Sequence, residues 1–157
     1  MSTNELFQSE PYDAVEEHEV PEIDQTKYLI FLSDGLMFGV DANSVVEIIT
    51  THAITALPMV PSYVSGIINL RGLIVPIIDI RLRLGKPSKP DCCIIVLNVF
   101  GTQVGILVDQ MDRMVDVENS TVLPVPKQNT EKMISGMSSL PDGGTMLVLD
   151  CDLLIHD

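Results

Sequence analysis

The chain alternates short apolar runs with turn residues over most of its length. Apolar residues 28–32 and 36–40 flank the turn signal Ser33-Asp34-Gly35, and this order predicts a β-hairpin. Apolar residues 94–100 and 103–108 flank Gly101-Thr102 and predict a second hairpin in the same way. Because no helical period lasts longer than about three turns, the pattern is typical of a β barrel or sandwich.

Two further strands are expected at residues 73–80 and 146–149. Pro76 lies inside the first of them. Proline has no backbone N–H to donate to a sheet, so we expect this position on an edge strand or at a bulge.

An internal repeat relates the two halves of the chain. Residues 29–40 and 95–106, 66 positions apart, share the order strand, turn, strand. Ser65-Gly66 and Ser135-Gly136, 70 positions apart, each follow a segment predicted as a short helix, beginning at Pro61 and near Thr130. Residues 76–79 and 147–150 match at an offset of 71.

The repeat predicts two similar units, at about 27–90 and 91–157, with exchange of strands between them left open. A unit of about 60 residues buries too little surface to be comfortably stable alone. Apolar residues make up 46% of the chain and aromatic residues only 4%. We therefore expect the units to share an aliphatic seam.

Acidic residues dominate the charge, with 22 Asp and Glu against 9 Lys and Arg. Residues 1–26 hold eight of the acids and no base, and are predicted to be an acidic, flexible tail. An acidic chain repels phosphates, so no nucleic acid partner is expected. The longest apolar runs have six residues. A membrane-spanning helix needs about 20 apolar residues, so direct membrane insertion is not expected. A secretory signal peptide is not expected either, because the N-terminal segment carries no base.

Few groups in the chain are able to carry out catalysis. Nucleophile elbows and phosphate loops are absent from the sequence, and no two histidines or cysteines have a metal-ligand spacing. The three cysteines, which are expected to be buried, unreactive thiols in strands, are Cys92, Cys93 and Cys151. No catalytic residue, metal site or cofactor is therefore expected.

Three aspartates, Asp79, Asp109 and Asp150, each end an apolar strand. An aspartate at such a position commonly caps the next turn, and this is the interpretation that we favour. An acid–base pair among them is the alternative.

Two charged residues, Glu47 and Arg71, interrupt apolar runs. A charge in such a run needs a partner, and arginine favours pairing with a carboxylate. Ser44-x-x-Glu47 also matches a capping box, in which the glutamate would bond to its own backbone. Both interpretations stay open. The remaining basic residues of this region are expected in a solvated loop; they are Arg81, Arg83, Lys86 and Lys89.

Residues 65–81 read SGIINLRGLIVPIIDIR. This segment is similar to G-x-x-N-L-R-G-x-(I/V)-x-P-(I/V)-(I/V)-D-(L/I)-R, a pattern of the CheW family of bacterial chemotaxis coupling proteins. Supporting matches are found at residues 38–41, 45–48, 105–109 and 149–154, so the resemblance extends from about residue 27 to 154.

The resemblance implies a mostly β fold of two SH3-like, five-stranded β barrels that share a hydrophobic seam, with a few short helices. It implies a non-catalytic scaffold, or adaptor, acting in chemotaxis signal transduction. Such a protein joins the cytoplasmic tip of methyl-accepting chemoreceptors to the regulatory domain of a CheA-type histidine kinase. It is cytoplasmic and is recruited to membrane-associated receptor arrays.

The family resemblance also implies an interaction groove for the receptor's helical hairpin, between the barrels. A helix in a groove needs aliphatic walls, small residues for close approach and polar anchors. Met114 occupies a position that is often valine in the family. The positions carried over are Val45, Glu47, Gly66, Asn69, Arg71, Gly105 and Met114.

Three alternatives of function stay open from the sequence. The first is a CheW-like adaptor in another chemosensory-type pathway, such as pilus-based motility. The second is an enzyme that uses the strand-end aspartates, and the third is a small-molecule-binding β protein.

Overall fold

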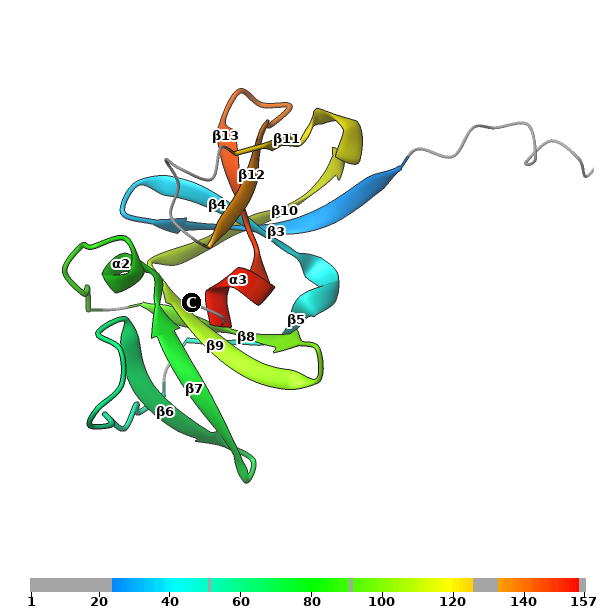
Figure 1. Ribbon diagram of the computed structural model, residues 1–157. Helices are drawn as coiled ribbons and strands as arrows, with labels where there is room; N and C mark the ends of the chain where they lie inside the picture. The colour runs from blue at the N-terminus through cyan, green and yellow to red at the C-terminus, as the bar shows by residue number, and fades with distance from the viewer. Residues whose placement is uncertain (1–23, 51, 91, 126–132, 156–157) are drawn as a thin grey trace, which may run out of the picture.

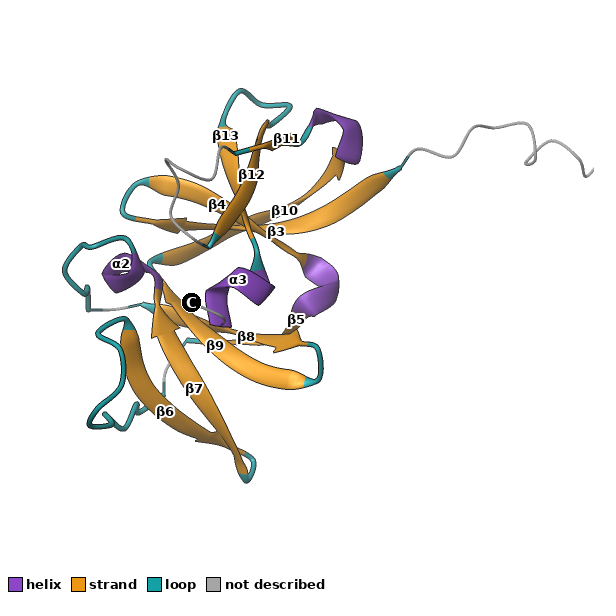
Figure 2. Cartoon of the chain, in the orientation of Figure 1, coloured by secondary structure: helices purple, strands orange, loops and turns teal. Residues whose placement is uncertain are grey.

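The structure is a computed structural model, and it describes residues 24–50, 52–90, 92–125 and 133–155. Strands form two sheets, one above the other in the view of Figure 1, and short helices lie at their junctions (Figure 2). The first sheet has the strand order β10-β3-β4-β13-β12-β11, and the second has the order β5-β8-β9-β7-β6. We call them barrel 1 and barrel 2.

The strands of barrel 1 are β3 (Gln25–Ser33), β4 (Leu36–Asp41), β10 (Gln110–Glu118), β11 (Leu123–Pro124), β12 (Ile134–Ser139) and β13 (Thr145–Leu149). The strands of barrel 2 are β5 (Val45–Ile49), β6 (Val64–Leu70), β7 (Leu73–Asp79), β8 (Cys93–Val99) and β9 (Thr102–Val108). The helices are η1 (Ala42–Ser44), α2 (Ile80–Arg83), η2 (Asn119–Thr121) and α3 (Cys151–Ile155).

Each sheet curls so that one continuous segment joins its two edges. In barrel 2 the chain leaves the edge strand β5, and Thr55 then pairs with Ile67 of the opposite edge strand, β6. Both backbone hydrogen bonds of this bridge measure 2.9 Å. In barrel 1 the edge strands β10 and β11 are joined through η2. The two-residue strand β11 is a sixth strand in a barrel that was expected to have five.

The chain passes between the barrels twice. It leaves barrel 1 after β4, enters barrel 2 through η1 and β5, and returns at Asp109 between β9 and β10. The sequence repeat is visible as equivalent connections, because the pair β3–β4 corresponds to β8–β9 and the parallel pair β4–β13 corresponds to β9–β7. The strands of barrel 2 therefore follow one another along the chain, whereas those of barrel 1 come before and after them, and neither barrel coincides with one half of the chain.

Strands β3 and β8 bury both of their faces, which explains their uninterrupted apolar runs. Tyr28 and Ile30 point into the core of barrel 1, whereas Leu29 and Phe31 belong to a cluster shared with barrel 2. On β8 the same alternation sends Ile94 and Val96 into the core of barrel 2 and Ile95 and Leu97 into the shared cluster. Leu154 of α3, which lies between the barrels in Figure 1, is also fully buried there. The expected apolar seam is confirmed.

The hairpin turns follow the chemistry expected of two-residue loops. Asp34 and Gly35 both have positive φ, 53° and 76°, as a type I′ turn requires. In the second hairpin the residues with positive φ are Phe100 and Gly101, so the turn lies one residue before the predicted Gly101-Thr102.

Two expectations about local structure are wrong. The predicted helix from Pro61 to Gly66 is a turn followed by β6, because Gly66 lies at a register shift where β6 meets Thr55 closely. Pro76 lies in β7, which is an interior strand. The proline is tolerated there because pairing of β7 with β9 begins only at Ile77. The corresponding helix predicted near Thr130 falls outside the described residues.

Candidate functional site

Glu47 of β5 and Arg71 of the β6–β7 turn form an ion pair at one end of barrel 2. The Arg71 Nη2 donates to Glu47 Oε1, and the arginine side chain is 69% exposed. This hydrogen bond raises the pKa of the Arg71 guanidinium above its usual value. Glu47 lies in a strand, and the cap of η1 is Asp41, whose carboxylate accepts from the Asn43 N–H at 2.9 Å. The capping-box interpretation is therefore wrong, and the pairing interpretation is correct.

Asn69 holds the turn that presents Arg71. Its Oδ1 accepts a hydrogen bond from the Gly72 N–H at 2.9 Å, while Arg71 and Gly72 have φ of 54° and 88°. A non-glycine residue at positive φ needs such local support. Asn69 therefore contributes to the site by shaping the turn.

Exposed aliphatic side chains flank the ion pair on both of its segments. Val46 and Ile48 alternate with Glu47 along β5 and are 41% and 42% exposed. Leu73 and Ile74, which follow Arg71 at the start of β7, are 47% and 53% exposed. We call this group the barrel 2 tip; its members are Val46, Glu47, Ile48, Arg71, Leu73 and Ile74. Large exposed aliphatic side chains close in sequence to an ion pair are a feature that protein-binding surfaces share.

The two glycines of the predicted groove lie inside barrel 2. A Cβ on Gly66 would lie 2.1 Å from the Thr55 carbonyl oxygen, and one on Gly105 would lie 2.5 Å from Ile77 Cδ1. The close approach that requires a glycine is therefore between segments of the barrel itself. A role of these glycines towards a partner stays a prediction.

The two remaining predicted positions lie on different barrels. Val45 is half-buried, begins β5 and packs against the shared apolar cluster. Met114 lies on β10 of barrel 1, opposite Leu29, with 51% of its surface exposed. The structure thus brings Val45, Glu47 and Arg71 to barrel 2 and places Met114 across the seam.

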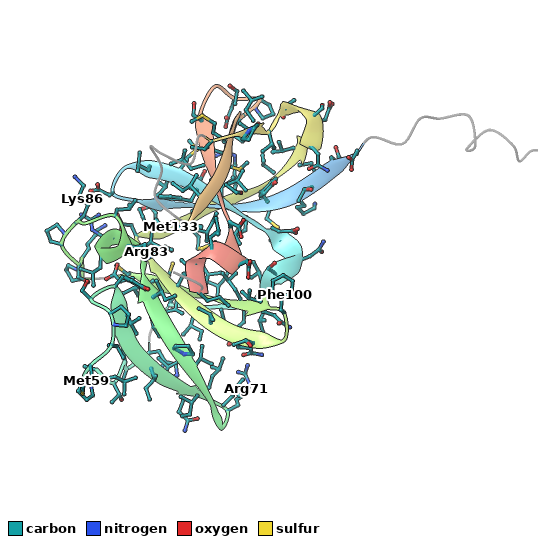
Figure 3. The ribbon with its side chains drawn as sticks, viewed as in Figure 1. Met59, Arg71, Arg83, Lys86, Phe100 and Met133 are labelled. Atoms are coloured by element: carbon teal, nitrogen blue, oxygen red, sulfur yellow. The ribbon has the colours of Figure 1, made fainter. Side chains whose placement is uncertain are left out.

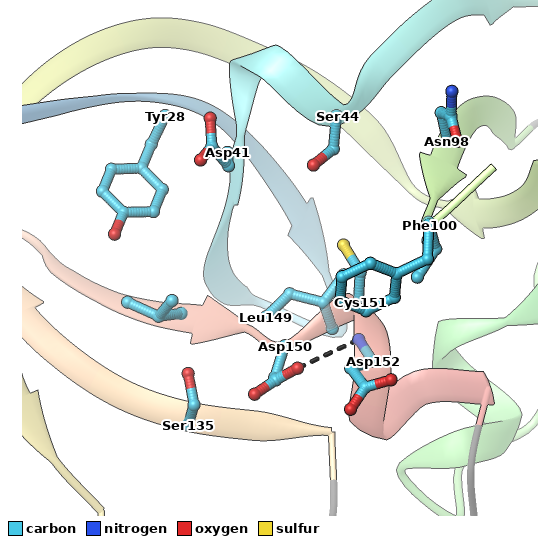
Figure 4. Close-up of a pocket in the computed structure, with 12 residues that line it drawn as sticks. Tyr28, Asp41, Ser44, Asn98, Phe100, Ser135, Leu149, Asp150, Cys151 and Asp152 are labelled. Carbon is cyan, nitrogen blue, oxygen red and sulfur yellow. Dashed lines mark hydrogen bonds between the residues drawn. The ribbon is translucent and has the colours of Figure 1, made fainter.

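A cavity of about 340 Å³ lies between η1, the β8–β9 turn and α3 (Figure 4). The Asp150 carboxylate caps α3 by accepting from the backbone N–H groups of Asp152 and Leu153 at 3.0 and 3.2 Å. Burial, and then the charges of Asp150 and Asp41, raise the pKa of the Cys151 thiol to about 11. At neutral pH this thiol is protonated and a poor nucleophile.

The other two strand-end aspartates also form structural hydrogen bonds. Asp79 caps α2, as expected, by accepting from the Arg81 N–H at 2.9 Å. For Asp109 the expected cap of the next turn is wrong, because its carboxylate accepts instead from Arg81 Nη1 at 2.8 Å and from the Asp34 N–H at 3.0 Å. Among the described residues, no group of three or more His, Cys, Asp or Glu is arranged to hold a metal ion.

Sequence reasoning missed the burial of Arg81. This arginine was expected in a solvated loop, but only 18% of its side chain is exposed and it pairs with Asp34 and Asp109. Cysteine placement was also only partly correct, since Cys93 is buried in β8 whereas Cys92 precedes the strand and Cys151 begins α3.

Comparison with known proteins agrees with this arrangement. Residues 27–157 match the CheW-like domain family. The chain is 40% identical over 97 residues to the probable chemotaxis protein CheW of Rhizobium etli, covering 60% of this chain and 63% of that protein. It is 31% identical over 129 residues to the chemotaxis protein CheW of Klebsiella aerogenes, covering 78% and 76%.

A solved structure has the same fold. The crystal structure of the scaffolding protein TtCheW from Thermoanaerobacter tengcongensis superimposes with a TM-score of 0.72 at 27% identity, covering 79% of this chain and 88% of that one. Twin β barrels with an apolar seam are thus the fold that this chain shares with TtCheW. The chain belongs to the CheW-like family. No helix among the described residues is long and apolar enough to cross a membrane.

Proposed function

We propose that this protein is a non-catalytic scaffold that couples chemoreceptors to a CheA-type histidine kinase at membrane-associated receptor arrays. The observation that carries the proposal is the barrel 2 tip, where an exposed ion pair joins two segments whose neighbouring residues in the chain carry exposed aliphatic side chains. The strand-end aspartates Asp79, Asp109 and Asp150 support a non-catalytic role, since each forms hydrogen bonds that hold the fold.

Two surfaces would serve two partners. The regulatory domain of the kinase resembles this fold and would pack against the barrel 2 tip, barrel against barrel. The receptor's helical hairpin would lie along the groove between the barrels, with Val45 on one wall and Met114 on the other. Aliphatic walls and one or two polar anchors are what a helix in a groove requires.

Signalling through such a protein would be positional. It would hold receptor and kinase in one assembly, so that a small movement of the receptor changes the equilibrium between kinase conformations. The free energy of coupling would then arise from differential contacts at two interfaces, without a chemical step.

Replacement of Arg71 by alanine tests the proposal. We expect Arg71→Ala to weaken binding of the kinase regulatory domain by about 10-fold or more, as loss of an interface anchor does. The fold should be retained, because an exposed ion pair adds little to stability. Binding is measured by isothermal titration calorimetry and folding by circular dichroism.

The matched control is Arg113→Ala. Arg113 also forms exposed ion pairs, with Asp112 and Asp142, but it lies on β10 of barrel 1. We expect this variant to bind normally. If Arg71→Ala unfolds the protein, or binds the kinase regulatory domain as well as the Arg113 variant does, the tip is not the docking surface.

A further inference from the structure

Arg81 joins the two barrels through charge and hydrogen bonds. All three guanidinium nitrogens have partners: Nε donates to the Pro87 carbonyl at 2.8 Å, Nη1 donates to Asp109 Oδ2 at 2.8 Å, and Nη2 lies 3.3 Å from Asp34 Oδ1. Pro87 belongs to the loop after α2 of barrel 2, Asp34 to the β3–β4 turn of barrel 1, and Asp109 to the crossing between them. We call Arg81, Asp34 and Asp109 the interbarrel ion cluster.

The arginine is held rigidly from the side of barrel 2. Its own backbone N–H donates to Asp79 Oδ1 at 2.9 Å, and the other oxygen of Asp79 accepts from Ser88 Oγ at 2.6 Å. Asp79 is only 1% exposed. A planar guanidinium fixed in this way loses little conformational entropy when it binds a carboxylate.

On the receiving side, one carboxylate oxygen of Asp109 is bonded to both barrels, while the other, Oδ1, is buried without a hydrogen-bond partner among the described residues. The Asp34 backbone N–H donates to Asp109 Oδ2 at 3.0 Å, so this one oxygen accepts from both barrels. The Asp109 N–H donates to the Leu32 carbonyl at 3.0 Å. The guanidinium and the two carboxylates are mostly buried, with 18%, 30% and 11% of their side chains exposed, so solvent screens these contacts weakly. Lys86, 3.9 Å from Asp34 and 54% exposed, adds little.

The barrels also meet at the apolar seam, whose attraction is non-directional. Burial of Leu29, Phe31 and their partners holds the barrels together but does not by itself select one relative rotation. Hydrogen bonds from a planar guanidinium are directional and permit few relative rotations. We propose that Arg81 is a positioning residue that fixes the angle between the two barrels. The angle sets the shape of the groove between them, and this second step rests on the proposed function.

Arg71 precedes β7 and Arg81 lies on α2, which follows it, so the two arginines lie at opposite ends of this strand. Figure 3 labels Arg71 at one end and Arg83 of α2 at the other. Seven strand residues span about 23 Å at about 3.3 Å per residue. Arg81 is therefore too far from the barrel 2 tip to contact a partner bound there.

Residual dipolar couplings of the isotopically labelled full chain test the angle directly. For the unmodified protein, the couplings of both barrels should fit one alignment tensor. For Arg81→Ala, separate fits to barrel 1 and barrel 2 should give tensors that differ in orientation or magnitude. Asp34→Asn should change the tensors of the two barrels in the same direction as Arg81→Ala does. This variant keeps the turn, because asparagine tolerates the positive φ at this position.

Arg83→Ala is the matched control. The Arg83 guanidinium stacks over the ring of Tyr63, 4.2 Å from its centroid, within barrel 2. This variant should leave a single tensor. If the couplings of the two barrels still fit one common tensor in both Arg81→Ala and Asp34→Asn, as in the unmodified protein, Arg81 acts only locally and the proposal is wrong. Should Arg81→Ala fail to fold, the Asp34→Asn result decides.

Receptor binding separates this inference from the proposed function. We expect Arg81→Ala to raise the Kd for a receptor hairpin fragment by about 2- to 30-fold, the usual range for residues that act on a site from a distance. Altered tensors with unchanged receptor binding would support the fixed angle but remove the groove as the receptor site. Unaltered tensors with weaker binding would contradict the positioning role and leave the proposed function standing.

Discussion

Arg71 and Phe100 lie in hairpin turns of the same local kind, and both hold a positive φ, 54° and 51°, that a bulky side chain rarely adopts. Each turn is braced by an asparagine two residues earlier, Asn69 or Asn98, which accepts from the following glycine N–H at 2.9 Å. The family motif around Asn69 is therefore a device for exposing the side chain at the turn. Its chemistry is local, which is why the sequence alone could indicate it.

The Cys151 thiol makes a prediction about pH. Its pKa in the folded protein is about 11, against the usual 9.0, so the folded chain keeps a proton that the unfolded chain releases between these values. The resulting stabilisation is complete below about pH 9 and is lost as pH rises towards 11. We expect the free energy of unfolding of the unmodified protein to fall relative to Cys151→Ser across this range.

Urea denaturation under reducing conditions, at several values between pH 7.5 and 10.5, measures this difference. Both proteins share all other titrating groups, so their common pH dependence cancels. A difference that does not change with pH would show that Cys151 is not shielded in the folded state.

Among the elements, the hairpins were the most predictable and the helices the least. The β3–β4 and β8–β9 hairpins followed from alternation and turn residues that are close in sequence. Helices α2 and α3 have four and five residues, too short for a helical period, and depend on the caps Asp79 and Asp150. Pro76 was misplaced because a strand's neighbours depend on the whole topology.

Closure of barrel 2 depends on Gly66. Its φ is +150°, and a Cβ would come within 2.1 Å of the Thr55 carbonyl oxygen, a backbone atom that cannot move aside. We expect Gly66→Ala to lower the free energy of unfolding by about 3 kcal/mol. Gly101→Ala, at φ +84° with nothing within 4 Å, should cost only about 1–2 kcal/mol.

Chemical denaturation of both variants measures these costs, and binding of a receptor fragment by the folded fraction separates packing from contact. If Gly66→Ala were as stable as Gly101→Ala but failed to bind, the glycine would contact the partner, as the family resemblance implies. The larger loss of stability predicted for Gly66→Ala, with unchanged binding by the folded fraction, would assign this glycine to the barrel.

For the molecule as a whole, the hairpins β3–β4 and β8–β9 each pair with strands of the other repeat, and this exchange ties the two barrels into one body. The repeat predicted the equivalence of the halves, but local patterns do not say which sheet a strand joins. The burial of Arg81 was unpredictable for the same reason, since Asp109 lies 28 positions away in the chain. The Glu47–Arg71 pair could be suggested, because a charge within an apolar run needs a partner.

Removal of the acidic N-terminal segment tests whether the body alone carries the interfaces. The expected boundary at residue 26 falls inside β3, which begins at Gln25, and Asp24 accepts from Asn119 N and Nδ2, both at 2.9 Å. The deletion should therefore end at residue 23. We expect the Kd for the kinase regulatory domain to be unchanged at physiological salt. A large loss of affinity would place part of an interface in the deleted segment.

The idea that two partners are held at once on separate surfaces is tested by reconstitution. The purified protein, the regulatory domain of its organism's CheA-type kinase and a receptor cytoplasmic fragment are mixed and analysed by size-exclusion chromatography with light scattering. We predict a single ternary complex, lost in Arg71→Ala and kept in Arg113→Ala. Two binary complexes that exclude each other, with no ternary species at any ratio, would contradict the account.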